Sequence, residues 1–277
     1  MSTTNARAKP AAAAMLAALG LAAQTSAADD YFSPTDERVR ISLGAMYVTS
    51  STDFQADSSA GVAGTNINGE RQFGLGKSDF EPKFEAMIRV DTRNRVSFDY
   101  FTLDRSGDAI VTGNPILFRD VTFLPGDPLQ TQLGLRMLGI TYGYSFWHTE
   151  TLEIAGTLGV HASDISAEAK VETQTQHIIQ TDDQAGPIPT VGIDATWVAS
   201  RRFYLDGRAQ YLHVHVGNLT GSLGIYEFDA LYRYRPNVSF AVGYTDVSAH
   251  IASTQSSQAG LFEFSTKGPE MFFRIAF

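Results

Sequence analysis

The chain has 277 residues, a formal net charge of -9 and a mean hydropathy of -0.10. It contains no cysteine, which excludes disulfides, thiolate metal sites and lipid attachment through a thiol. After the N-terminal segment no long apolar run occurs, so spanning helices are excluded, and no basic tract or glycine-rich phosphate loop indicates nucleic acid or nucleotides.

Residues 1–28 have the pattern of a removable secretory signal. Arg7 and Lys9 form a positive region, residues 11–23 an apolar stretch and residues 25–27 a small-residue cleavage site. The apolar stretch is shorter than the ~20 residues that a membrane anchor needs. We therefore expect cleavage after Ala27 or Ala28, which leaves residues 29–277 as the mature chain.

From residue 38 onward, apolar and polar residues alternate with a period of two. In residues 80–91, for example, Phe84 and Ile88 share one face while Lys83 and Arg89 share the other. Comparable segments occupy residues 38–47, 96–100, 138–146, 152–161, 191–197, 203–211, 226–233, 238–245 and 268–277. Strands with one apolar and one charged face are typical of a membrane barrel, whose mean hydropathy stays near zero. We predict an all-β fold: a transmembrane, antiparallel, up-and-down β-barrel of about ten strands, with eight or twelve as alternatives.

The connections between these segments differ in length. Those at residues 92–94, 147–150, 200–201 and 235–237 are tight, whereas those at 52–79, 107–129, 171–187 and 249–267 are long and polar. Short turns face the periplasm and long loops face outward, although residues 218–221 form a short turn on the outer side. Aromatic residues near the tight turns predict a belt at the membrane border: Tyr142, Tyr144, Phe146, Trp147, Trp197, Phe203, Tyr232 and Tyr234. A soluble β-sandwich is disfavoured, because the apolar faces are too continuous to lie in water.

The polar faces of the predicted strands would carry charge into the lumen. The predicted lumen residues are Arg38, Arg40, Glu81, Lys83, Glu85, Arg89, Asp99, Asp194, Asp206, Arg208, Glu227, Asp229, Arg233, Glu270 and Arg274. A barrel of this size is narrow enough for side chains to fill, and buried charges need partners. We therefore expect a salt-bridged network in the lumen; a conducting path and a catalytic array remain the alternatives.

The last strand alternates up to the C-terminus. Met271, Phe273, Ile275 and Phe277 form its apolar set. This ending resembles the C-terminal signal by which Gram-negative outer-membrane barrels are recognised for insertion. The resemblance implies the cell outer membrane as location and the barrel-assembly machinery as a partner of this strand.

Catalytic candidates in the sequence are weak. Outer-membrane lipid hydrolases use a serine with a histidine, and His161 with Ser163 is the one such pair expected to point inward near the outer rim. An omptin-like protease would need paired aspartates and an Asp–His couple at the rim. The candidate residues, which match no omptin motif, are Asp164, Asp182, Asp183, His213 and His215. His213 and His215 could share a metal, but no third ligand is evident, so no metal site and no cofactor are predicted.

A family resemblance rests on residues 93–107, RNRVSFDYFTLDRSG, with residues 141–146 and the final Gly268 and Pro269. The chain resembles an uncharacterised family of Gram-negative outer-membrane β-barrel proteins. The resemblance implies the barrel fold and the outer-membrane location, and it brings no catalytic residues. We expect a structural or surface-interaction role among outer-membrane lipid and lipopolysaccharide, with a narrow channel or small-solute binder and a lipid-active hydrolase as alternatives.

Overall fold

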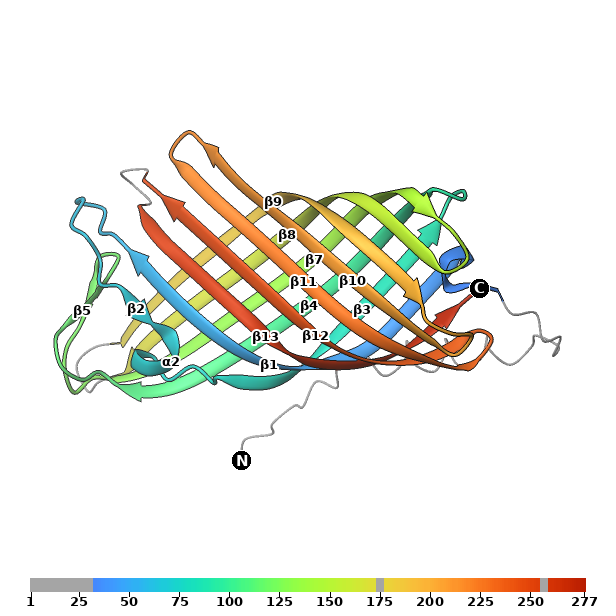
Figure 1. The fold of residues 1–277 in the computed structure, drawn as a ribbon. Helices are drawn as coiled ribbons and strands as arrows, with labels where there is room; N and C mark the ends of the chain where they lie inside the picture. Colours follow the sequence, from blue (N-terminus) through green and yellow to red (C-terminus); the bar gives the residue numbers. More distant parts are fainter. Residues whose placement is uncertain (1–31, 173–176, 255–258) are drawn as a thin grey trace, which may run out of the picture. The chain divides into compact units, whose positions relative to one another are not determined.

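The computed structural model describes residues 32–172, 177–254 and 259–277. Their long antiparallel strands close into a ring, because β13 pairs with both β12 and β1 (Figure 1). The ten strands of the ring are β1 (Val39–Ala56), β3 (Ser78–Arg89), β4 (Asn94–Ile110), β7 (Pro128–His148), β8 (Leu152–Glu172), β9 (His177–Val198), β10 (Phe203–Val216), β11 (Leu219–Arg235), β12 (Val238–Ser253) and β13 (Gly260–Ala276). The predicted barrel of about ten strands is confirmed; the predicted signal segment lies outside the described residues.

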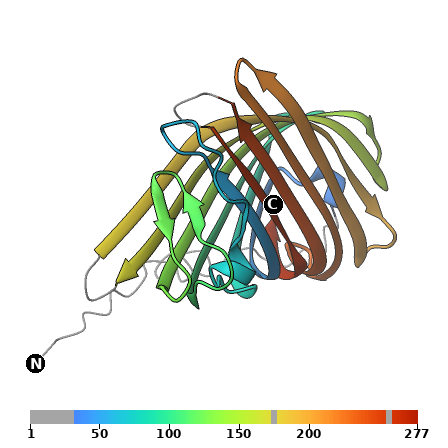
Figure 2. The ribbon, with the colours of Figure 1, turned by 90° about the vertical axis from the view of Figure 1, so that its left-hand side faces the viewer.

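Short elements lie at the two ends of this barrel. The 3-10 turn η1 (Pro34–Asp36) precedes β1 at the end with the short turns. At the other end lie β2 (Ile67–Asn68), α2 (Gly69–Gln72) and the hairpin of β5 (Ile116–Phe118) and β6 (Val121–Phe123), as Figure 2 shows. Among the described residues, no helix is both long enough and apolar enough to cross a membrane.

Near the short turns, the strands turn their apolar residues outward. The outward side chains of Phe84, Ile140 and Phe240 are 38%, 49% and 54% exposed, whereas Glu153 and Glu270 on the inward face are buried. Alternation places successive side chains on opposite faces of a strand. This part of the barrel therefore has an apolar exterior and a charged interior, as a lipid-embedded barrel requires.

Aromatic residues mark the border of the apolar exterior at the short turns. Seven of the predicted belt residues are among the exposed large side chains: Tyr142, Tyr144, Phe146, Trp147, Trp197, Phe203 and Tyr234. A register shift between Ser145 and Trp147 places Phe146 and Trp147 on the outside together. The bulge thus adds a second aromatic anchor to this strand at the level of the lipid headgroups.

Tyrosines mark the opposite border. On five strands the last apolar outward residue before the polar stretch toward the long loops is an exposed tyrosine: Tyr47, Tyr100, Tyr211, Tyr226 and Tyr244. We call the strand segments between the short turns and these tyrosines the membrane half, and the segments beyond them the outer half. From Tyr100 to the end of β4 at Ile110, the outer half adds about 33 Å along the strand.

The strands extend farther outward than the sequence predicts. Much of each predicted long connection is strand, since β1 runs to Ala56, β12 to Ser253 and β9 begins at His177. The physical reason is that the outer half stands beyond lipid, so the alternation that identified the membrane strands ends at the tyrosines. The short outer turn is also shifted: Gly217, with φ of 60°, turns the chain, and β11 already begins at Leu219.

Candidate functional site

The interior of the membrane half is the candidate functional site, and Lys83 lies at its centre. The Lys83 ammonium group contacts carboxylates from three strands: Glu85 at 3.2 Å, Glu227 at 2.8 Å and Glu270 at 2.9 Å. All four side chains are at most 14% exposed. Inward positions of β3, β11 and β13 therefore converge on one cation, which links strands from opposite parts of the chain.

Arg208 joins this cluster to a second one. Its guanidinium lies 3.2 Å from Glu227, 3.6 Å from Glu85 and 3.6 Å from Asp194. Asp194 also pairs with Arg95 at 3.2 Å. Separately, Arg274 of β13 donates to Asp206 of β10 and, at 3.1 Å, to the hydroxyl of Ser42. The result is a branched network in which each cation serves more than one acceptor.

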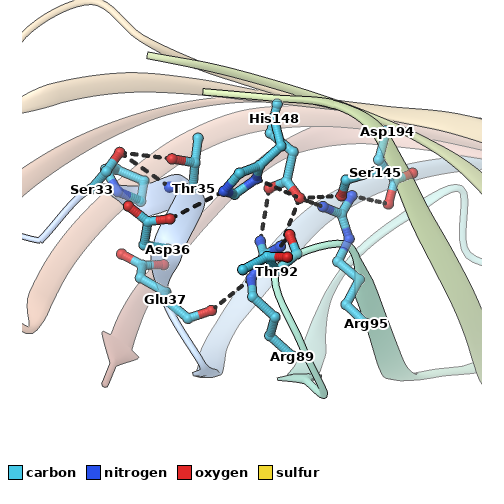
Figure 3. A network of polar contacts seen from close by, with 12 residues as sticks. Ser33, Thr35, Asp36, Glu37, Arg89, Thr92, Arg95, Ser145, His148 and Asp194 are labelled. Atoms are coloured by element: carbon cyan, nitrogen blue, oxygen red, sulfur yellow. Dashed lines mark hydrogen bonds and ion pairs between the residues drawn. The ribbon is translucent and has the colours of Figure 1, made fainter. Parts of the chain in front are cut away.

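The network continues to the short-turn end, where Glu153 is fully buried. Figure 3 shows Arg89, Arg95 and Ser145 of this end. Arg89 donates to both carboxylate oxygens of Glu153 at 2.8 Å, Arg95 lies 2.8 Å from the same group, and Ser145 donates to it. Two charge-assisted bonds from one guanidinium fix direction as well as distance. Glu153 thus holds β3, β4, β7 and β8 together at this mouth.

The segment before β1 folds into the same mouth. Glu37 is 1% exposed and pairs with Arg40 at 2.7 Å and Arg233 at 3.0 Å. Arg233 also donates to the carbonyl of Phe32 at 2.7 Å, and the Ser33 hydroxyl donates to the carbonyl of Glu150 at 2.5 Å. Residues 32–37 therefore cover the interior at the short-turn end.

A small polar cavity lies within the network. It measures about 60 Å³ and is lined by side chains that include Glu85, Arg95, Asp194, Arg208 and Asp229. In four of these side chains the polar atom that faces the cavity is part of an ion pair described above, whereas Asp229 has a buried carboxylate oxygen without a hydrogen bond from a described residue. Such a volume fits only a few water molecules.

The interior of the outer half is mainly apolar, although it also holds a buried ion pair between Arg105 and Glu70. One buried cluster contains Met46, Val48, Leu75, Phe101, Leu103, Leu133, Leu135 and Phe264, and a neighbouring one contains Met137, Leu223, Ile225 and Val247. A third, beneath the β5–β6 hairpin, includes Phe73, Phe118 and Phe123. Side chains thus fill the interior of the outer half much as they fill a soluble core.

Most predicted lumen residues join the network, with qualifications. Arg38 is exposed at the start of β1 and lies outside it. Glu81 is buried, and Asp99 lies 3.7 Å from His161. Two members were missed: Arg95 and Glu37. Arg95 lies on the same face of its strand as Ser97 and Asp99, so the alternation of that strand predicts an inward side chain. Glu37 precedes the first strand, where no alternation indicates the direction of its side chain.

The predicted inward pair His161 and Ser163 does not form an accessible catalytic couple. His161 is 1% exposed, and its Nε2 lies 3.1 Å from the amide oxygen of Gln210. Gln210 in turn donates to Thr141 at 3.3 Å. His161 is therefore packed between the ion network and the apolar clusters, where a lipid or peptide cannot reach it.

The predicted rim residues also separate. Asp164, His213 and His215 are exposed, and the alternation of β8 and β10 turns them to the outer wall rather than into the barrel mouth. The Nδ1 atom of His215 is hydrogen-bonded to the hydroxyl of Thr220 at 2.8 Å. The side chains of Asp182 and Asp183 lie outside the described part. Within the described residues, no three His, Asp or Glu side chains form a group suited to a metal ion.

The fold has relatives among solved structures. The outer-membrane protease OmpT from Escherichia coli superimposes with a TM-score of 0.57 at 10% identity, covering 92% of this chain and 99% of that one. The toluene transporter TodX of P. putida gives 0.36 at 7% identity (87% and 90% covered), and Neisserial surface protein A gives 0.31 at 13% (86% and 97%). No family model and no curated protein matches the chain. With its apolar exterior, the chain has the fold of a Gram-negative outer-membrane β-barrel, as predicted.

Proposed function

We propose that this protein is a closed, non-conducting outer-membrane barrel whose outer half interacts with molecules of the cell surface. The observation that supports closure is that side chains fill the interior at every level along the barrel axis. Residues 32–37 cover one mouth, the ion network fills the membrane half, and packed apolar clusters fill the outer half. An ion crossing this interior would have to displace paired charges and then enter an apolar core, both of which are costly.

Planar-bilayer recording tests closure. The refolded protein should give no single-channel steps under conditions in which a porin added to the same bilayer conducts. Reproducible steps from the unmodified barrel would overturn the proposal and favour the narrow channel.

Lipopolysaccharide is the surface partner that we propose for the border of the outer half. Arg136 of β7 and Lys267 of β13 are exposed outward residues that lie just beyond the apolar belt. Cations at this level would meet the phosphates of the lipid headgroup, while Tyr100 and Leu138 beside Arg136 contact the acyl region.

Thermal unfolding in micelles with and without lipopolysaccharide tests this contact. Added lipopolysaccharide should raise the Tm of the unmodified barrel and raise it less in an Arg136→Glu/Lys267→Glu variant. Gln132→Glu, an outward change farther from the border on β7, is the matched control. An equal increase in all three proteins would count against the contact.

A further inference from the structure

Five outward side chains form one row across the outer half. His213 of β10 is opposite Ser222 of β11, Ser222 is opposite His250 of β12, His250 is opposite Glu263 of β13, and Glu263 is opposite Asp53 of β1. Directly opposite residues on neighbouring strands have Cβ atoms roughly 5 Å apart. The fold therefore brings two histidines, a serine and two carboxylates together on the outer wall, beyond the tyrosine border.

His250 and Glu263 are in direct contact. The Nδ1 atom of His250 lies 2.9 Å from a carboxylate oxygen of Glu263, and both side chains are accessible, at 38% and 50% exposed. A carboxylate at Nδ1 holds the proton on that nitrogen and leaves Nε2 as the basic one. With Nδ1 on Glu263 of β13, the basic Nε2 is turned away from that carboxylate, and Ser222 is opposite His250 on the other neighbouring strand, β11.

Ser222 occupies the place of a nucleophile in this row. It is half-buried between the strands that carry His213 and His250. Ser222 and His250 both lie in the described part of the chain, and no hydrogen bond joins them there. Catalytic hydrogen bonds of this kind often form fully only when substrate binds. The His250 imidazole is the side chain directly opposite Ser222 on β12, and it is oriented by a third group, which is the arrangement that activates a hydroxyl.

Two tyrosines of the outer border lie next to the row that contains Ser222. Gly224, the next outward position on β11, has no side chain, and a Cβ there would lie 3.1 Å from the Ser248 hydroxyl, 3.2 Å from the Tyr226 ring and 3.6 Å from the Tyr211 ring. The two rings therefore lean over Gly224, immediately on the membrane side of Ser222. Two aromatic rings at this point can hold the hydrocarbon part of a molecule that extends from the membrane.

We propose that Ser222, His250 and Glu263 form a hydrolase site on the outer wall for carboxylic esters of amphiphiles at the membrane surface. Ser222 is the nucleophile, His250 the general base and acid, and Glu263 the positioning residue. His213, opposite Ser222 on the other side, supplies an N–H for the oxyanion. This activity goes beyond the proposed surface role and does not involve His161 or Ser163.

The reaction consumes one water molecule for each ester. The Ser222 hydroxyl attacks the ester carbonyl while its proton passes to Nε2 of His250. The tetrahedral oxyanion collapses, the C–O bond to the alcohol breaks, and His250 returns the proton to the leaving alcohol. Water then attacks the acyl-serine, giving up a proton to His250, and the carboxylic acid leaves as Ser222 regains its hydrogen.

The test uses the predicted mature chain, residues 29–277, refolded in detergent micelles and in vesicles. A fluorophosphonate probe should label one serine, identified as Ser222 by peptide mass spectrometry, and p-nitrophenyl butyrate should be hydrolysed above background. Ser222→Ala and His250→Ala should each lower kcat/KM by roughly a hundredfold or more, and Glu263→Gln by at least about tenfold. Phospholipid vesicles and vesicles containing lipopolysaccharide, analysed for released fatty acid, distinguish the two sources of lipid ester.

Two controls make the result decisive. Ser248→Ala removes an outward hydroxyl one row closer to the membrane and should keep both labelling and turnover. His161→Ala changes the buried histidine and should also retain turnover per folded barrel, with folding followed by the gel mobility of unheated samples. Absence of probe labelling in the folded wild type, or turnover that is equal in the wild type and in Ser222→Ala, would overturn the site. Neither result bears on conductance, so it leaves the proposed closed barrel standing.

Discussion

The membrane half and the outer half of this barrel are built on opposite rules. In the membrane half the outward residues are apolar, such as Ile140, and the inward ones are charged, such as Lys83. In the outer half Gln132 faces outward on the same strand as Ile140, and Leu133 and Leu135 face inward. One continuous set of strands thus passes from a lipid-adapted wall to a water-adapted wall without a change of fold.

The difference teaches that the surroundings of a strand, rather than its backbone, decide which face is apolar. Lipid outside leaves the interior as the place for paired polar groups, while water outside makes the interior the place for apolar burial. The inversion also explains the closed lumen, because each half fills its interior mainly with the residue type that its exterior excludes.

The largest effect is expected from removing the central cation of the membrane half. Lys83→Met would leave Glu85, Glu227 and Glu270 without their shared partner, and breaking a buried ion pair costs about 3–5 kcal/mol. Urea unfolding from phospholipid vesicles, followed by the fluorescence of Trp147 and Trp197, measures the loss. Adding Glu270→Gln to this variant should restore part of the stability; a double variant less stable than Lys83→Met would contradict the role assigned to the cation.

A cavity in the outer half should cost somewhat less and by a different mechanism. Leu103 is 1% exposed within the apolar cluster, so Leu103→Ala loses about 2–5 kcal/mol through lost burial and the empty space left behind. Leu103→Met keeps most of the volume and should cost under about 1.5 kcal/mol. If both variants unfold at the same urea concentration as the wild type, the outer half is not packed as a core.

A pair of arginine substitutions on β7 locates the boundary between the halves. Ile140→Arg places a charge on the lipid face and should cost about 2–4 kcal/mol if this position lies near the bilayer midplane. Gln132→Arg, eight residues away on the same outward face, should stay within about 0.5 kcal/mol, because that position lies in water. An equal loss of unfolding free energy in the two variants would mean that both positions lie in the same environment. It would contradict a boundary between lipid and water on β7.

The boundary between the halves is also the point up to which the strands could be predicted from the sequence. The membrane strands could be predicted because alternation against lipid is strict, as in residues 138–146 of β7. The outer extensions could not, because residues such as Ser50, Thr52 and Thr131 face inward while polar residues also face outward. The pattern there no longer separates the two faces.

The candidate sites follow the same division. Most lumen charges could be assigned by strand parity alone, and parity also indicates Arg95. The row of Ser222, His250 and Glu263 could not be assigned, because its members are separated by 41 positions of sequence and meet only through the register of β11, β12 and β13. Register depends on turn geometry and pairing, which the periodicity of single strands does not determine.

The smallest effect is expected outside both halves, at the turn between β3 and β4. The exposed Asp91 carboxylate accepts hydrogen bonds from the backbone N–H groups of Arg93 and Asn94, each at 2.8 Å, and from the Asn94 side chain. These bonds, that of the Arg93 N–H first, lower the pKa of Asp91 below its ordinary value of 3.8. The stabilisation is therefore present at neutral pH and is lost as the pH falls through the lowered pKa.

Asp91→Ala should consequently lower the urea midpoint slightly near neutral pH and have no effect once the wild-type carboxyl is protonated. Urea titrations of both proteins at several pH values, from neutral to strongly acidic, measure the difference. Asp79→Ala, which removes an exposed carboxylate from the start of β3, controls for net charge. A difference between Asp91→Ala and wild type that persists unchanged into strong acid would show that the turn is held by something other than the ionised Asp91, whereas the two-halves description would be unaffected.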